Sequence, residues 1–174
     1  MSLRHLIIAS CGIPLAACVS VPRVAAAPST APTFDVVRFF SGVSHGNGTL
    51  RVATKQPVRV EVDSDGRMGA DVTLNLVQRI REGAKPERTR SWALREISPG
   101  QWSGTLTDAD GPVSARALPG TLLINFPMDG MRVHQRLTLS SDGQVARNIL
   151  TVRKWGFTVA SLDETITRGP RATR

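Results

Sequence analysis

The sequence predicts an all-β protein, an antiparallel up-and-down β-barrel of about ten strands. Apolar and polar residues alternate along successive segments, as where Val58, Val60 and Val62 are interleaved with charged residues. Short turn sequences separate these segments, and no amphipathic helical pattern is available to cover an apolar sheet face. A sheet that closes on itself buries its apolar face and removes its edges, so a barrel is favoured over a two-sheet sandwich.

The N-terminal segment, residues 1–17, is predicted to be an export signal peptide. Arg4 leads into an apolar run from Leu6 to Ala17, which is too short to span a bilayer. The run ends in Leu15-Ala16-Ala17-Cys18, which resembles the lipobox of bacterial lipoproteins, and this predicts lipidation at Cys18. The alternative is an ordinary signal cut near residues 25–27, with Cys18 incidental.

The rest of the chain divides into three parts. Residues 18–33 are predicted to be the lipidated cysteine and a Pro/Ala-rich tether, because they lack large apolar groups and periodicity. Residues 34–168 form the barrel domain, and 169–174 are an expected disordered tail. After removal of the signal about 155 residues remain, which is enough for one domain with a core of its own.

Turn sequences give the order of the strands. Ser64–Arg67 is predicted to be a hairpin turn, followed by a long strand through residues 68–80. Further turns are expected at 108–111, 119–120, 129–130 and 141–144. The last two strands are expected near 145–154 and 157–167, with Gly156 as the bend between them. An outer-membrane barrel is disfavoured, because the chain has no Tyr and few other aromatic residues for the lipid-facing belts.

The net charge constrains the partners. The formal charge of +8 becomes about +7 without Arg4, and arginine supplies nearly all of it. Outside the cytoplasm nucleic acid is not an available partner, and anionic phospholipid or outer-membrane glycolipid is. A solvated basic surface with no partner is the alternative. With Cys11 in the signal and Cys18 lipidated, no disulfide is expected.

Few residues suggest catalysis. Gly42-Val43-Ser44-His45-Gly46 matches the G-x-S-x-G motif of hydrolases, but a turn and strand follow it rather than a helix. His134 is the other available base, and alternation places it on the outer face. Two histidines and no free cysteine after the signal do not make a metal site, so neither a metal nor a cofactor is expected.

Polar and aromatic residues in the inward register suggest a ligand cavity instead. A cavity would use the amides to orient the polar end of an apolar ligand, with tryptophans in its wall. In a filled core the amides would hydrogen-bond to each other, to water or to backbone. The candidate lining residues are Leu74, Gln78, Trp92, Trp102, Phe126, Gln135 and Asn148.

Several short motifs occur in a recognisable order along the chain. They are Phe34, Phe39-Phe40-Ser41-Gly42, Arg90-Ser91-Trp92-Ala93-Leu94, Gly100-Gln101-Trp102-Ser103-Gly104 and Lys154-Trp155-Gly156. Together with the lipobox they resemble domain-of-unknown-function family 3833 of proteobacterial lipoproteins, over residues 33–168. The resemblance implies a lipocalin-like, calycin-type barrel in an envelope lipoprotein, often encoded near enzymes that modify membrane fatty acids. It supplies no catalytic residues.

The sequence therefore favours a non-enzymatic envelope lipoprotein whose barrel binds a fatty acid or another lipid. Val19 and Ser20 after Cys18 lack the aspartate associated with inner-membrane retention, which favours the periplasmic face of the outer membrane. One alternative is a structural or assembly lipoprotein with a filled barrel, and another is an esterase that depends on Ser44. The ligand and the oligomeric state are left open.

Overall fold

The computed structural model describes residues 19–23, 25–28 and 30–169. The predicted signal peptide, the predicted lipidation site at Cys18 and residues 170–174 of the expected tail lie outside the described residues.

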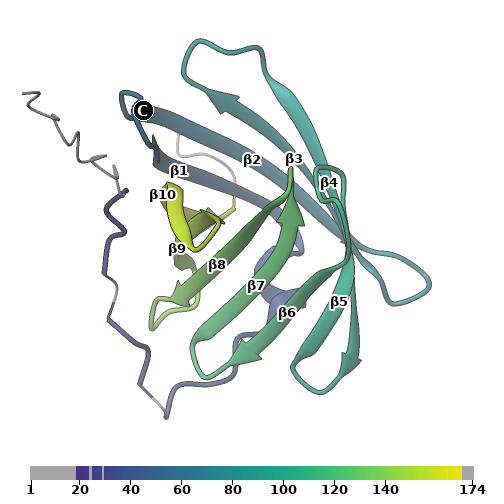
Figure 1. Cartoon of the computed structure of the whole chain (residues 1–174). Coiled ribbons are helices and arrows are strands. Elements are labelled where there is room, and N and C mark those ends of the chain that lie inside the picture. Colours follow the sequence, from purple (N-terminus) through teal and green to yellow (C-terminus); the bar gives the residue numbers. More distant parts are fainter. Residues whose placement is uncertain (1–18, 24, 29, 170–174) are drawn as a thin grey trace, which may run out of the picture.

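Ten antiparallel strands of the described chain close into a barrel in which each strand pairs with its neighbours in sequence (Figure 1). β10 pairs with β1 and closes the sheet, for example at Gly48 opposite Glu164. The strands are β1 (Gly42–Val52), β2 (Val58–Met68), β3 (Leu74–Glu82), β4 (Arg88–Ser98), β5 (Gln101–Leu106), β6 (Val113–Leu118), β7 (Thr121–Met128), β8 (Met131–Leu139), β9 (Val145–Lys154) and β10 (Phe157–Arg168). The predicted all-β, up-and-down barrel is confirmed.

One predicted turn is wrong. Residues 64–67 lie within β2, and the chain reverses at residues 69–73 instead. Asp71 makes that turn, because its carboxylate accepts hydrogen bonds from the backbone N–H (3.3 Å) and the hydroxyl (2.7 Å) of Thr73. Gly66 serves close packing rather than a turn, since a Cβ there would lie 1.9 Å from the carbonyl oxygen of Phe40.

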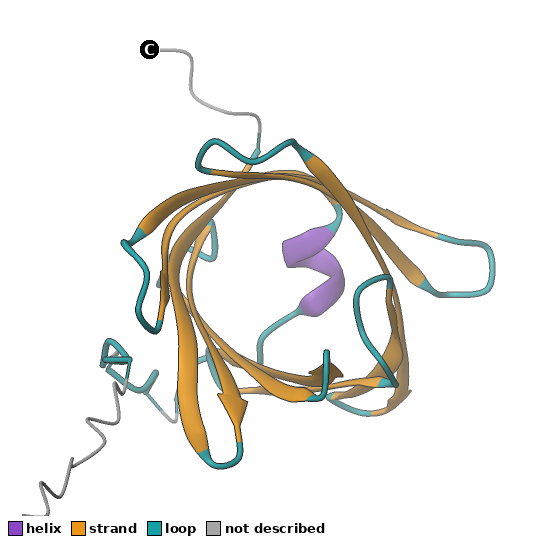
Figure 2. Ribbon diagram, turned by 45° about the horizontal axis from the view of Figure 1, so that its top comes forward, coloured by secondary structure: helices purple, strands orange, loops and turns teal. Residues whose placement is uncertain are grey.

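The Phe40 carbonyl belongs to a short helix that the sequence analysis did not predict, α1 (Val36–Phe40). Figure 2 shows α1 inside the ring of strands. Asp35 caps the helix by accepting a 2.9 Å hydrogen bond from the Arg38 N–H. The rings of Phe34, Phe39 and Phe40 pack together, with centroids 5.0 Å apart for Phe39 and Phe40. Within the described residues no helix has the length and apolar character needed to cross a bilayer.

The two ends of the barrel differ. α1 precedes β1 directly, and the turns β2–β3, β4–β5, β6–β7 and β8–β9 surround the same end, which we call the closed end. α1 plugs this end, and the Phe34 N–H just before the helix holds it there by donating to the Leu118 carbonyl at 3.0 Å. The turns β1–β2, β3–β4, β5–β6, β7–β8 and β9–β10 surround the opposite end, which we call the open end.

Val19 and Ser20 lie against the outer wall of β10, and Val21 and Pro22 lie beside β7, β8 and β9. The Val19 N–H donates to the Thr158 carbonyl (3.4 Å), and the Ser161 hydroxyl donates to the Ser20 carbonyl (3.2 Å). Ser161 points away from the barrel interior and is nevertheless 0 % exposed, because this segment covers it. Farther along, the carbonyl of Pro32 accepts from the Gly120 N–H at the closed end. Among the described residues, Val19 thus lies near the open end and Pro32 at the closed end.

Candidate ligand-binding cavity

The barrel encloses a cavity of about 390 Å³ between α1 and the open end. Phe40 of α1 forms its floor, and Met128 and Met131 lie toward the open end. Most of the wall is aliphatic and comes from nearly every side of the barrel, as the following residues show: Leu50, Val52, Val60, Val62, Leu74, Leu76, Ile80, Leu94, Ile124, Leu137, Leu150, Val152, Leu162 and Ile166. The volume falls within the range of small-molecule sites, roughly 300–1,000 Å³.

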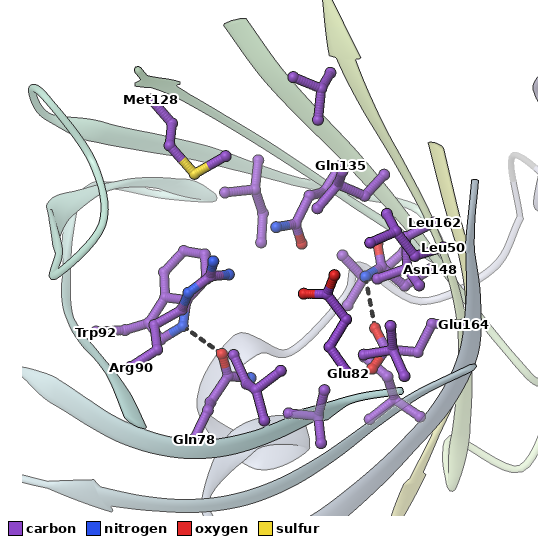
Figure 3. A pocket seen from close by; sticks show the side chains of 18 of the residues that line it. Leu50, Gln78, Glu82, Arg90, Trp92, Met128, Gln135, Asn148, Leu162 and Glu164 are labelled. Atoms are coloured by element: carbon purple, nitrogen blue, oxygen red, sulfur yellow. Dashed lines mark hydrogen bonds between the residues drawn. The ribbon is translucent and has the colours of Figure 1, made fainter. Parts of the chain in front are cut away.

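The structure brings most of the predicted lining residues together. Leu74, Gln78, Trp92, Gln135 and Asn148 line the cavity. Figure 3 labels the last four of them. The other two, Trp102 and Phe126, are buried in the barrel core but do not line the cavity. The Phe126 ring packs edge-on against Trp92 at a centroid distance of 5.7 Å, so it supports the wall from behind.

One set of polar side chains in the wall, Trp92, Gln78 and Ser64, is linked by hydrogen bonds. The indole Nε1–H of Trp92 donates to Gln78 Oε1 at 2.7 Å, and Gln78 Nε2 donates to Ser64 Oγ at 3.2 Å. These bonds hold the Trp92 ring against the cavity, because the indole N–H has its partner within the wall.

A second polar group is an acid and an amide on adjacent strands. Asn148 Nδ2 donates to Glu164 Oε2 at 2.9 Å. Glu164 is only 5 % exposed, and burial raises the pKa of its carboxyl; the Asn148 hydrogen bond and the charges of Arg90 and His45 act in the opposite direction without cancelling it. Asn148 Oδ1 is buried and has no hydrogen-bond partner among the described residues.

Two glycines of β1 make room for this acid. Gly46 and Gly48 face Glu164, and a Cβ on Gly46 would lie 2.1 Å from Glu164 Oε1. A Cβ on Gly48 would lie 2.9 Å from Glu164 Cβ. The Gly-rich sequence around Ser44 therefore serves to admit a buried carboxyl from the next strand.

A charged group lies on the β3–β4 side of the cavity. Figure 3 shows the carboxylate of Glu82 and the guanidinium of Arg90 pointing into the cavity. Burial lowers the pKa of Arg90, although the guanidinium remains cationic at neutral pH. The Asp108 carboxylate, near the open end, accepts hydrogen bonds from both Arg90 (2.8 Å) and Arg88 (2.7 Å). It therefore balances part of the positive charge of Arg90.

Sequence reasoning did not single out Glu164, Glu82 or Arg90. The signal for Glu164 was its place in the inward series with Ala160, Leu162 and Ile166. A charged residue in an apolar register is a site candidate, because burial of its charge is costly unless it serves an interaction.

Ser44 and His45 of the serine motif do not form a serine–histidine pair. Ser44 points into the barrel and is 5 % exposed, and its hydroxyl has no hydrogen-bond partner among the described residues. His45 lies on the opposite face of β1, where its Nδ1 is 2.7 Å from Asp63 Oδ1. The hydrogen bond from serine to histidine that such a mechanism needs is therefore not present. Among the described residues no cluster of three or more His, Cys, Asp or Glu forms a metal site.

Comparison of the sequence with known families gives a match over residues 13–168 to the family described as "Protein of unknown function (DUF3833)". The chain belongs to this family. The resemblance stated from the short motifs is thereby confirmed. Among curated proteins nothing matches.

Two solved structures resemble the DUF3833 barrel. The S-type phycobiliprotein lyase CPES from Guillardia theta has a TM-score of 0.60 at 9 % identity, covering 78 % of this chain and 91 % of that chain. A protein of unknown function from the DUF3598 family of Nostoc punctiforme has a TM-score of 0.55 at 12 % identity. That alignment covers 84 % of this chain and 53 % of the other, so the DUF3833 chain spans about half of that protein. At these identities the likeness shows the fold, a lipocalin-like barrel.

Proposed function

We propose that this chain binds an elongated apolar molecule with one polar end, such as a fatty acid or another lipid, inside its barrel. The observation that carries the proposal is a cavity of about 390 Å³ with an aliphatic wall and one buried, incompletely satisfied polar pair, Glu164 and Asn148. An aliphatic wall favours an acyl chain, and a few convergent polar groups fix its orientation. The structural alternative requires a filled barrel, and the cavity does not favour it.

The polar pair fits a ligand group that both accepts and donates hydrogen bonds. A protonated Glu164 donates through its O–H, and Asn148 Oδ1 accepts. A carboxylic acid or an amide has both functions. Such a ligand would satisfy the buried Asn148 oxygen, whose desolvation otherwise costs about 1–3 kcal/mol.

We further propose that the protein is a lipoprotein of the cell envelope, anchored through Cys18 on the periplasmic face of the outer membrane. The lipobox-like Leu15-Ala16-Ala17-Cys18 sequence supports this. A Cys18→Ser variant should be released from membranes when cells are fractionated. Continued membrane association of that variant through residues 1–17 alone would contradict the lipid anchor.

A bulky residue within the cavity tests the ligand proposal. Ala160 lines the cavity, so Ala160→Phe places a ring in the space that the acyl chain would occupy. Ala93→Phe is the matched control, because Ala93 lies on the outer face of β4. A fluorescent fatty acid should not bind to Ala160→Phe and should bind to Ala93→Phe as it does to the wild type. The proposal would be refuted if both variants bind the probe equally. It would also be refuted if the wild type has no affinity for the probe and carries no co-purified lipid in native mass spectrometry.

The polar end has its own test. Glu164→Gln keeps a neutral hydrogen-bonding group and should bind a fatty acid as the wild type does at acidic pH, whereas Glu164→Leu should bind it about fivefold to tenfold more weakly, the value of one hydrogen bond. Equal affinity of the leucine variant would show that the polar end of the ligand lies elsewhere.

A further inference from the structure

The β9–β10 turn carries the two largely exposed aromatic side chains of the described residues. Trp155 is 86 % exposed and Phe157 is 57 % exposed. Trp155 and Gly156 both have positive φ, 49° and 86°, as the central residues of a two-residue hairpin turn do. Asn or Gly is preferred at the first of these positions, so the stability of the turn does not account for a tryptophan there.

Basic side chains lie beside these aromatic rings. Lys154 Nζ is 4.8 Å from the centroid of the Trp155 ring, and Arg153 donates to the Gly156 carbonyl at 3.1 Å. The chain has three lysines, and all three, Lys55, Lys85 and Lys154, lie in or next to turns of the open end. Of these, Lys85 is paired with Glu82. The turn that holds Lys55 adjoins β10, because the Ala53 N–H donates to the Val159 carbonyl at 2.9 Å.

The N-terminal segment reaches the barrel at the same place. Val19 hydrogen-bonds to Thr158, two residues after Gly156, and Ser161 then bonds to Ser20. Cys18, the proposed lipid anchor, directly precedes Val19 in the sequence. An anchor at Cys18 would therefore bring the open end toward the bilayer.

A second exposed apolar group lies at the closed end and is a weaker candidate. Met68, Val72 and Ile97 are exposed there, but all are aliphatic. Asp65 and Asp71 lie among them, and Arg67 is paired with Asp65 at 2.8 Å. Trp favours the interfacial zone of a membrane and basic residues favour its anionic surface, and this combination is found at the β9–β10 turn.

We propose that the open end of the barrel docks on an anionic lipid bilayer through the β9–β10 turn. Trp155 and Phe157 enter the interfacial zone, Lys154 and Lys55 contact the headgroups, and the cavity mouth faces the membrane. The docking does not depend on the proposed ligand, since none of these four side chains lines the cavity.

The fluorescence of Trp155 tests the orientation. The full-length chain is reconstituted in vesicles of phosphatidylethanolamine with a minority of phosphatidylglycerol, and lipids with brominated acyl chains serve as quenchers. The wild type should be quenched more strongly than Trp155→Phe, because the phenylalanine keeps an apolar turn and removes the reporter. In a Trp155→Phe, Ile97→Trp double variant the exposed tryptophan is at the closed end. This variant should not show the extra quenching that the wild type shows over Trp155→Phe.

Two further variants test the chemistry of the contact. Each of Lys55→Gln and Lys154→Gln should lower the ratio of docked to undocked protein about fivefold at low salt, from the energy of one basic residue at an anionic surface. Ile97→Ser, the control at the closed end, should leave Trp155 quenching unchanged. The proposal is overturned if wild type and Trp155→Phe are quenched alike, or if the closed-end reporter is quenched as strongly as Trp155.

The same measurement separates this proposal from the proposed ligand. Quenching that persists in Trp155→Phe reports on Trp92 and Trp102, which are buried in the barrel, and therefore on brominated lipid in the cavity. Loss of the Trp155 component alone would refute docking and leave ligand binding intact. Loss of the buried component alone would refute binding of these lipids in the cavity and leave docking intact.

Discussion

The exchange Glu164→Gln tests whether the buried carboxyl is uncharged in the folded barrel. Glu164 lies in the cavity wall, and burial raises its pKa above the ordinary value of 4.5. Glutamine has nearly the same shape, and its oxygen accepts the 2.9 Å hydrogen bond that Asn148 donates. The exchange therefore removes the titration and preserves the packing.

The sign of the effect follows from proton binding. Above about pH 4.5 the unfolded chain releases the Glu164 proton while the folded protein keeps it, until the pH passes the folded pKa. In that window the free energy of unfolding of the wild type falls by up to about 1.4 kcal/mol per pH unit through this group. Below it both states are protonated, and there is no loss. The Gln variant should therefore gain up to about 3–6 °C in Tm over the wild type for each pH unit within the window.

Thermal unfolding followed by circular dichroism, from about pH 2 to pH 8, measures the difference between the two proteins and includes the acidic range in which the control titrates. Asp163→Asn is the control of opposite sign. Asp163 lies on the outer face of β10, and its hydrogen bonds to Arg147 (3.0 and 2.8 Å) lower its pKa. The stabilisation that Asp163 gains from Arg147 is present at pH values above the pKa of Asp163 in the unfolded chain. It is lost as the pH falls through the lower pKa of Asp163 in the folded protein. Parallel curves for wild type and Glu164→Gln across the whole range would refute the assignment of a protonated Glu164.

Three other variants test the packing, with urea unfolding as the measurement. Gly46→Ala should cost about 1–3 kcal/mol through its clash with Glu164, and adding Glu164→Ala should recover most of that cost; additive losses would contradict the close approach. Gly66→Ala should cost about 3 kcal/mol or more, because the Phe40 carbonyl oxygen occupies the position of the new Cβ, and a neutral result would mean that α1 does not plug the barrel. Ser44→Ala should stabilise the fold by about 1 kcal/mol, since it removes a buried hydroxyl without a partner; a loss of stability would show that the hydroxyl is bonded.

The barrel could be predicted because, in a single sheet with one buried face, the alternation of apolar and polar residues along a strand shows which side chains are buried. β9 and β10 are the clearest case, since their predicted ranges, 145–154 and 157–167, match the structure to within one residue. The order of strands also followed, because short turns allow only neighbouring strands to pair. The same logic placed Gln78, Gln135 and Asn148 on the inner face.

The same logic failed where a residue had a second use. Gly66 indicated a turn, but its lack of a Cβ serves the approach of α1, which no local pattern reveals. α1 has five residues, too few to show a helical period. Glu164 and Arg90 were passed over because alternation treats a charged residue as outward-facing, whereas a cavity wall needs a few polar groups.

The charge state of Glu164 bears on which end group the proposed ligand would carry. Arg90 and Glu164 project into the cavity from β4 and β10. Arg90 is paired with Asp108 at 2.8 Å and Glu82 is paired with Lys85, so a protonated Glu164 adds an uncharged O–H donor beside the Asn148 oxygen that has no partner. An ionised Glu164 would lose that donor and place a buried negative charge beside the Asn148 oxygen. Burial of Glu164 among aliphatic side chains favours the protonated form, and the proposed ligand is therefore better matched by an acyl chain with an uncharged carboxylic acid or amide end than by a cationic lipid.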